Sequence, residues 1–259
     1  MDLEKNLQIT AEDNLIEEAY QKYKSLKKLV NEWQELNGAS FTEKVELSDK
    51  PPYLLVRNFP LDTVLNLWQK LNLHTNIKIS DAELIKIWGV AVINENLANT
   101  EIDQELLMHL QMTISGLAQL VNEKVNNEDS NNIRKALVND YREINCPVCG
   151  EIPAITALKP PNGNRVIHCL VCNNERNYRR NSCIYCDNSD TKKLMYLNNE
   201  IYPGIEVVAC KECGQFFKEI DARHLVVDDY TWEDIRTLPL NFAAELWLKE
   251  NVSHSKKVH

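Results

Sequence analysis

The sequence predicts a multidomain α+β fold: an all-helical N-terminal domain, two small metal-binding β modules and a short C-terminal helix. Apolar residues recur at helical spacing before about residue 144, and cysteine is absent there. All eight cysteines follow, in four Cys-x-x-Cys pairs. We therefore expect a helical domain over 1–143, metal modules over 144–181 and 182–227, and a C-terminal helical segment with a tail over 228–259.

The first predicted helix follows a capping signal at Thr10 and Asp13 and runs to about Glu35. Its apolar residues are spaced by threes and fours, which predicts one buried face made of Leu15, Ala19, Tyr23, Leu26, Val30 and Trp33. Residues 37–59 contain Gly38 and a Pro-Pro pair, so we expect a long ordered connection there.

Further helices are predicted over about 61–71, over about 80–91 behind a capping box, and over about 103–125, where the apolar repeat is strongest. The polar run 126–132 predicts a loop before a short helix over 133–141. Tryptophans on these apolar stripes are interpreted as core residues. The chain has no Gly-rich phosphate loop, His-Glu-x-x-His or Gly-x-Ser-x-Gly motif, so we expect no catalytic residues and no enzymatic activity.

The net charge of the chain and the lengths of its apolar runs limit the kinds of partner that we expect. The formal net charge is −9, and residues 1–140 carry 14 basic and 22 acidic residues. This acidity argues against a nucleic-acid partner. No apolar run approaches the length of a membrane span, so we expect no membrane insertion. Residues 1–30 begin charged and lack the features of a secretory signal, which favours a reducing cytoplasmic location.

The cysteine spacing is typical of metal knuckles. Two residues between thiolates let a tight turn direct both sulfurs at one ion, and two such turns complete a tetrahedron. The pairs are Cys146/Cys149, Cys169/Cys172, Cys183/Cys186 and Cys210/Cys213. Four pairs therefore predict two four-thiolate sites, while redox chemistry at a metal-free pair stays open as an alternative.

The intervals between the pairs favour sequential grouping. Nineteen residues separate Cys149 from Cys169, and 23 separate Cys186 from Cys210, which suits a hairpin in each case. This pattern is typical of rubredoxin-like or zinc-ribbon modules. It assigns the first four cysteines to one ion and the last four to the other, with an interleaved arrangement left open.

Either grouping gives closed shells of four thiolates, in which zinc would be structural and iron redox-capable. The sequence does not distinguish the two metals. His168 precedes Cys169 directly and is interpreted as a strand residue or as a hydrogen-bond donor behind the ligands.

The residues around the cysteines form an ordered set of motifs. They are Cys146-Pro147-Val148-Cys149-Gly150, then Gly163-x-Arg165-x-x-His168-Cys169, then Glu175 and Arg180, then Cys210-x-x-Cys213-Gly214-x-x-Phe217-Lys218, and finally Asp234-x-x-Thr237-Leu238. Together they resemble the formate dehydrogenase accessory protein family, FdhE, over about residues 146–241.

The resemblance implies an all-helical domain followed by two rubredoxin-like modules. It also implies a cytoplasmic, non-catalytic assembly factor that binds the catalytic subunit of a formate dehydrogenase, or of a related molybdenum or tungsten oxidoreductase. The chain departs from the family pattern at Arg176-Asn177, where members carry Trp-His, and at Asn241, where they carry aspartate. A homo-oligomer is compatible with this expectation.

The segment between the predicted modules carries Arg176, Arg179 and Arg180. One interpretation is compensation of the thiolate charge, including a pair between Glu175 and Arg180; Glu175 and His168 are then support residues behind the metal ligands. The other is a partner-binding patch of guanidinium groups. Two rival functions also stay open: a redox or sulfur-handling protein with one metal-free Cys-x-x-Cys pair, and a zinc-ribbon nucleic-acid-binding module.

Overall fold

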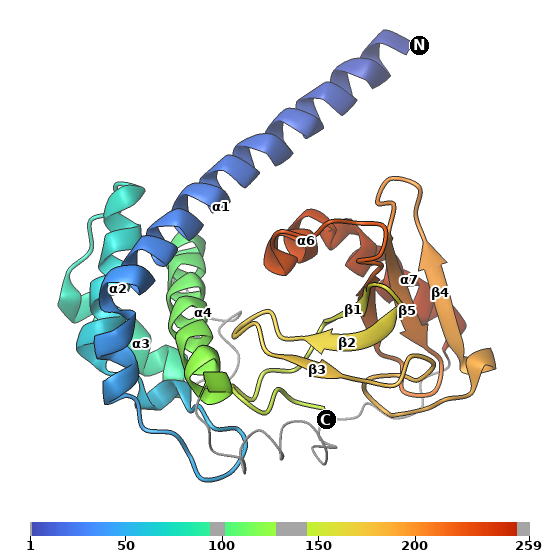
Figure 1. Cartoon of the computed structure of the whole chain (residues 1–259). Helices are drawn as coiled ribbons and strands as arrows, with labels where there is room; N and C mark the ends of the chain where they lie inside the picture. Colours follow the sequence, from blue (N-terminus) through green and yellow to red (C-terminus); the bar gives the residue numbers. More distant parts are fainter. Residues whose placement is uncertain (1, 94–101, 128–143, 253–259) are drawn as a thin grey trace. The chain divides into compact units, whose positions relative to one another are not determined.

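The structure is a computed structural model that describes residues 2–93, 102–127 and 144–252 (Figure 1). The chain divides into two compact units, Met1–Glu128 and Asp129–His259. In the described ranges the first unit contains only helices, and the second contains a mixed sheet followed by helices. The predicted fold class is therefore confirmed, while the helix expected over 133–141 lies outside the described residues. No described helix combines the length and apolar character needed to cross a bilayer.

The helices of the first unit are α1 (Asp2–Lys44), α2 (Leu61–His74), α3 (Asp81–Ile93) and α4 (Gln104–Asn127), with a 3-10 turn at Val56–Asn58. Helices α1, α2 and α4 pack against one another. A Cβ atom on Gly116 of α4 would lie 2.5 Å from Val30 Cγ1, so only glycine permits this close approach to α1. The core side chains include Leu26, Val30, Trp33, Leu67, Trp68, Leu71, Leu110, Leu117 and Val121.

Helix α1 differs from the prediction at both ends. It begins at Asp2, ahead of the Thr10–Asp13 capping signal, and continues to Lys44, so the expected end near Glu35 was wrong. The helix passes through Gly38 because this residue packs against Leu120 of α4, and such packing outweighs a helix propensity deficit of about 1 kcal/mol.

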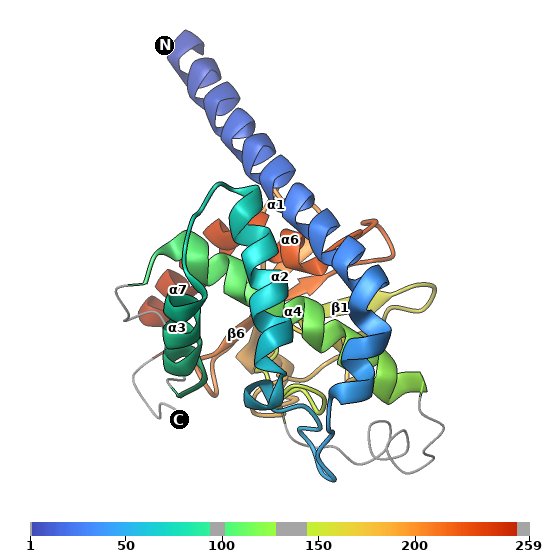
Figure 2. The same ribbon diagram turned by 90° about the vertical axis from the view of Figure 1, so that its left-hand side faces the viewer.

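The predicted buried face of α1 is buried only in part. Leu26, Val30 and Trp33 lie in the core, but Leu15 is 65% exposed and Ala19 is also exposed. The cause is visible in Figures 1 and 2, where the N-terminal half of α1 extends past the other helices of its unit. The apolar residues at helical spacing therefore continue along α1 beyond the part of the helix that is buried in the core.

The sheet of the second unit has the strand order β3-β2-β1-β6-β5-β4. It consists of two three-stranded antiparallel meanders, one made of β1 (Ile155–Lys159), β2 (Asn164–His168) and β3 (Glu175–Asn177). The other is made of β4 (Leu194–Asn198), β5 (Ile205–Cys210) and β6 (Phe216–Ile220). The two predicted hairpins are present, but β3, β6 and the parallel pairing of β1 with β6 that joins the meanders were not predicted.

A buried ion pair reinforces this junction between the meanders. Arg165 of β2 is 2% exposed, and its Nε donates to Glu219 Oε2 of β6 at 2.5 Å. Arg165 Nη1 also donates to the carbonyl oxygens of Arg179 and Ser182, in the segment between the meanders. Removing one member of a buried pair leaves an uncompensated charge, which costs about 3–5 kcal/mol. Arg165 therefore binds both meanders and their connection into one body.

Two C-terminal helices, α6 (Tyr230–Arg236) and α7 (Leu238–Asn251), complete the second unit. Asp229 caps α6 by accepting from the backbone amides of Thr231 and Trp232. Helix α7 buries Leu240 and Ala244 in the same apolar cluster as the strand residues Ile155, Ile205, Val207 and Ile220. This packing covers part of the sheet from water.

The helical unit contains one buried histidine. His109 Nδ1 lies 2.7 Å from Asn72 Oδ1, and His109 Nε2 lies 4.0 Å from Glu105 Oε1, which is itself paired with Lys22 at 2.8 Å. Burial lowers the pKa of His109, and the nearby Glu105 only partly opposes this effect. The folded unit therefore holds His109 neutral.

We expect the helical unit to lose stability as the pH falls from 7 to 5. The unfolded chain binds a proton at His109 near its ordinary pKa of about 6.5, whereas the folded chain binds it only at lower pH. The substitution His109→Gln keeps an amide beside Asn72 and cannot titrate, so its urea midpoint should depend less on pH. Equal pH dependence in the two proteins would contradict the role of His109.

Candidate metal centres

The four Cys-x-x-Cys turns share one backbone design. In each turn the amide of the first cysteine donates to a carbonyl five residues later, and the amide four residues later donates back to that cysteine, at 2.8 to 3.0 Å. The residue after the second cysteine has a positive φ in all four turns. These residues are Gly150 (80°), Asn173 (58°), Asp187 (58°) and Gly214 (70°). Glycine, asparagine and aspartate are the residue types that tolerate this region, so the local sequence permits each turn.

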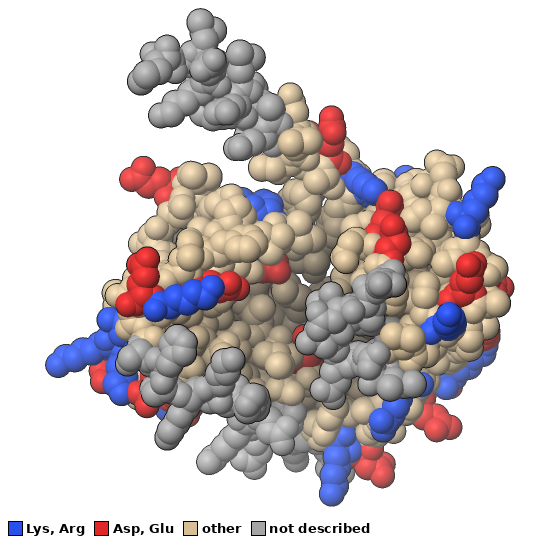
Figure 3. Space-filling model, turned by 180° about the vertical axis from the view of Figure 1, so that it is seen from behind, with Lys and Arg blue, Asp and Glu red and all other residues tan. Residues whose placement is uncertain are grey.

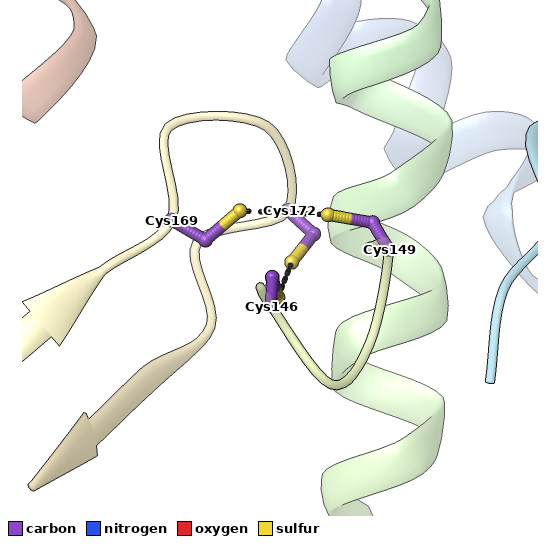
Figure 4. Close-up of side chains that lie close together, drawn as sticks. All are labelled: Cys146, Cys149, Cys169 and Cys172. Carbon is purple, nitrogen blue, oxygen red and sulfur yellow. Dashed lines mark hydrogen bonds between the residues drawn. The ribbon is translucent and has the colours of Figure 1, made fainter. Parts of the chain in front are cut away.

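The folded meanders bring the turns together in two groups. Within each group the four Sγ atoms all lie within 4.8 Å of one another: Cys146, Cys149, Cys169 and Cys172 in the first centre, and Cys183, Cys186, Cys210 and Cys213 in the second. This is the grouping that sequential pairing assigns. Figure 4 shows the sulfurs of the first centre pointing toward one another from two separate turns.

The sulfur separations fit a tetrahedral metal ion. Cys146 and Cys149 lie 3.5 Å from Cys172 and Cys169, respectively, and the corresponding pairs of the second centre are 3.7 and 3.8 Å apart. A tetrahedron with metal–sulfur bonds of about 2.3 Å has edges of about 3.8 Å, whereas a disulfide requires about 2.05 Å. All eight cysteines are free thiols in the structure. The donor set therefore suits one ion at each centre.

The electrostatics of the thiols favour a cation as well. Hydrogen bonding to Cys146, Cys149 and Cys169, followed by burial, raises the pKa of the Cys172 thiol. Four thiolates this close cannot coexist without a positive charge between them. In the second centre the amide of Tyr185 also donates to Cys183 Sγ at 3.4 Å, which stabilises the thiolate form.

The two centres differ in their access to solvent. In the first centre three cysteines are buried and Cys149 is partly buried. In the second centre Cys186 is exposed. An ion in the second centre is therefore easier for a solvent-borne competitor to reach.

His168 and Glu175 lie beside the first centre, but they do not join its four donors. His168 Nδ1 lies 3.1 Å from Glu175 Oε1, and the His168 ring stacks on Tyr230 of α6 at 4.2 Å. Lys159 Nζ donates to Glu175 Oε1 at 2.7 Å. Burial acts to raise the pKa of Glu175, but the hydrogen bonds from His168 and Lys159 outweigh it and hold the pKa below its ordinary value. The expected pair between Glu175 and Arg180 was therefore wrong, because Lys159 takes that position.

The three arginines of residues 176–180 have different surroundings: Arg176 lies on β3, whereas Arg179 and Arg180 follow that strand. Arg176 donates to the carbonyl oxygen of Ile144, and Arg179 pairs with Asp187. Arg180 is exposed and makes no ion pair with a described residue. Of the three, Arg180 is the one whose guanidinium is best placed to meet another molecule.

Arg180 lies at the wall of a groove in the second unit, with a volume of about 940 Å³. The groove is lined by polar and aromatic residues, among them Tyr196, Tyr202, Glu206 and His224. Burial, together with the charges of Glu219 and Asp221, raises the pKa of Glu206. Sequence reasoning missed this groove because its residues come from four separated segments that only the sheet topology brings together.

A comparison with protein-family models finds no match for this chain. A protein named "Protein FdhE homolog" from Aquifex aeolicus is 34% identical over 110 residues, which is 40% of this chain and 37% of that protein. A protein of the same name from Shewanella oneidensis is 26% identical over 98 residues, which is 37% of this chain and 32% of that protein. The match thus spans only about a third of the length of these relatives.

Among solved structures, the chain resembles the crystal structure of the FdhE protein from Pseudomonas aeruginosa. The TM-score is 0.53 at 17% identity, with 87% of this chain and 76% of that chain covered. This likeness is one of fold. Together with the curated relatives, it confirms the resemblance to the FdhE family that the motifs around the cysteines predicted.

The positive φ of the metal turns can be tested at Gly214. A Cβ atom there would meet nothing within 4 Å, so Gly214→Ala adds only conformational strain and should destabilise the metal-loaded unit by about 1–2 kcal/mol. Gly214→Asn should cost less, because asparagine adopts the same conformation at Asn173. Urea unfolding measures both changes. A free energy of unfolding unaltered by Gly214→Ala would show that the turn tolerates another geometry.

The difference in solvent access predicts two phases of metal release. A chromophoric chelator should remove the ion from the second centre first, because exposed Cys186 can be attacked from solvent. The variant Cys149→Ser disrupts the first centre and should retain only the fast phase. A single phase in the unmodified, fully loaded chain would contradict this order.

Proposed function

We propose that this chain, which resembles the FdhE proteins, is an accessory factor that binds the catalytic subunit of a formate dehydrogenase during its maturation and catalyses no reaction itself. The observation that carries the proposal is the pair of four-cysteine centres set in an FdhE-like fold. A related molybdenum or tungsten oxidoreductase is the other client within the same class. We place this function in the cytoplasm, where thiols stay reduced.

Each centre is proposed to hold one zinc or iron ion on its four cysteines, so that all eight cysteines are metal ligands. Four thiolates complete a tetrahedral shell, so no coordination position remains for a substrate or a water molecule. The ion, when bound, crosslinks two turns and balances thiolate charge. This closed shell supports a structural role for the protein's metal sites and a function carried by its surface.

The groove beside Arg180 is the proposed contact surface for the client. It combines an exposed guanidinium with two tyrosines, Tyr196 and Tyr202, and these side chains are of the kinds that dominate protein interfaces. His168 and Glu175 are proposed to support the fold beside the first centre. Arg176 and Arg179 are proposed to contribute less to binding, because both already interact within the unit.

Two alternative functions have less support. A redox function at a metal-free Cys-x-x-Cys pair requires one pair to stand apart, whereas all eight sulfurs fall into the two groups. A nucleic-acid-binding module requires a basic surface. In Figure 3 the Lys and Arg side chains of the described residues alternate with Asp and Glu on the face in view. The formal net charge of −9 further weakens attraction to phosphate.

The proposal predicts that the metal-loaded chain captures the formate dehydrogenase catalytic subunit from a lysate of its host. The variant Arg180→Glu should weaken this capture about tenfold, which corresponds to about 1.4 kcal/mol. Lys192→Glu makes the same charge change at another exposed residue of the second unit and should leave capture unchanged.

Quantitative pull-down with mass spectrometry distinguishes the outcomes. Failure of the metal-loaded chain to recover any molybdenum or tungsten oxidoreductase subunit would contradict the function. Equal losses for Arg180→Glu and Lys192→Glu would instead contradict the groove as the contact surface.

A further inference from the structure

Helix α1 carries an apolar seam that is buried at one end and exposed at the other among the described residues. The seam follows heptad steps of three and four, and its members are Ile16, Ala19, Tyr23, Leu26, Val30 and Trp33. The last three lie in the core, whereas Ile16 is 47% exposed and the flanking Leu15 is 65% exposed. One continuous seam is thus covered at its C-terminal end and open to solvent at its N-terminal end.

A helix that extends past its own bundle gains stability when a partner covers its apolar side chains. The N-terminal half of α1 extends past α2, α3 and α4 in both ribbon views (Figures 1 and 2). Helices without tertiary packing are only marginally stable in water, because propensity alone offsets little of the nucleation cost. A heptad seam is covered best by another helix, which inserts its side chains between those of the first.

The distribution of charge along α1 indicates what kind of partner helix would fit it. Residues 2–18 carry six acidic residues and one lysine, and residues 19–28 carry four lysines and no acidic residue. Glu17 and Glu18 are exposed near the end of the acidic part, and Lys24 and Lys28 are exposed in the basic part. Lys28 reaches Glu32 only at 3.9 Å with 77% of its side chain exposed, so this pair holds it weakly.

We propose that the N-terminal half of α1 pairs antiparallel with the same segment of a second copy of the chain. In this arrangement the acidic part of each α1 lies along the basic part of the other, and the exposed N-terminal ends of the two apolar seams cover each other. A two-fold interface of this kind is isologous, because the same patch serves both partners. A partner helix of a single charge sign would match only one part of α1, whereas a second copy matches both.

The charge pattern provides a sharp test by light scattering across a concentration series at low salt. The unmodified chain should reach twice its monomer mass of 29.9 kDa. Glu17→Lys combined with Glu18→Lys leaves residues 2–28 with seven lysines and four acidic residues, whereas Lys24→Glu combined with Lys28→Glu leaves three lysines and eight acidic residues. Each double variant is therefore repelled by its own copy and should associate at least tenfold more weakly. A mixture of the two double variants should recover the dimer, because their segments now complement each other.

The apolar seam is tested separately. Leu15→Ser combined with Ile16→Ser should also give monomers, while Leu36→Ser, which changes an 81% exposed leucine near the other end of α1, should not. Metal content and helical circular dichroism report folding in every variant, since all eight cysteines stay intact. These readouts do not depend on a client, so the inference can fail while the proposed function holds.

Three results would overturn the inference. The unmodified chain could stay monomeric at all concentrations, as it would if its own second unit or another protein covered the seam. The mixed variants could stay monomeric. A dimer that none of the substitutions weakens would place the contact on a different surface.

Discussion

The convergence of four sulfurs at each centre is the constraint on which the second unit depends. Cys146 and Cys172 meet across 26 residues of chain, and Cys183 and Cys213 meet across 30. In each case the β-hairpin between the two turns returns the chain to its starting point. The sulfurs are also part of the core: Cys183 and Cys210 belong to one apolar cluster with Ile184, Leu194, Val208 and Phe217. Small modules bury little apolar surface, so an ion bound at each centre would contribute free energy that their own cores do not supply.

The buried pair of Arg165 and Glu219 connects these centres to the proposed contact surface. Arg165 lies on β2, four residues before Cys169, and its side chain donates to Glu219 of β6. Glu219 lines the groove, as does Leu158 of β1. The groove therefore spans the junction between the two meanders, and its shape depends on both centres. On the proposed function, an ion bound at either centre would influence client binding through the shape of this groove.

Local patterns predicted most of the elements, and long-range packing decided the remainder. The capping box at Ser80 and Glu83 forms as expected, because its hydrogen bonds involve residues three apart. The cysteine intervals predicted the two hairpins for a similar reason. By contrast, the parallel pairing of β1 with β6 joins strands about 60 residues apart and leaves no periodic signal. The continuation of α1 through Gly38 depends on Leu120, which the sequence near Gly38 cannot reveal. The groove was not predicted, because its lining residues lie far apart in the sequence. Only Arg180 among them had been singled out, as part of the motifs around the cysteines.

The most direct test of the account is to measure metal content and sulfur coordination together. Elemental analysis of anaerobically purified protein should give two zinc or iron ions per chain, and X-ray absorption at the metal edge should give four sulfur neighbours at about 2.3 Å. One ion per chain with two titratable thiols, or nitrogen or oxygen neighbours in place of sulfur, would contradict the two closed centres on which the fold and the proposed function depend.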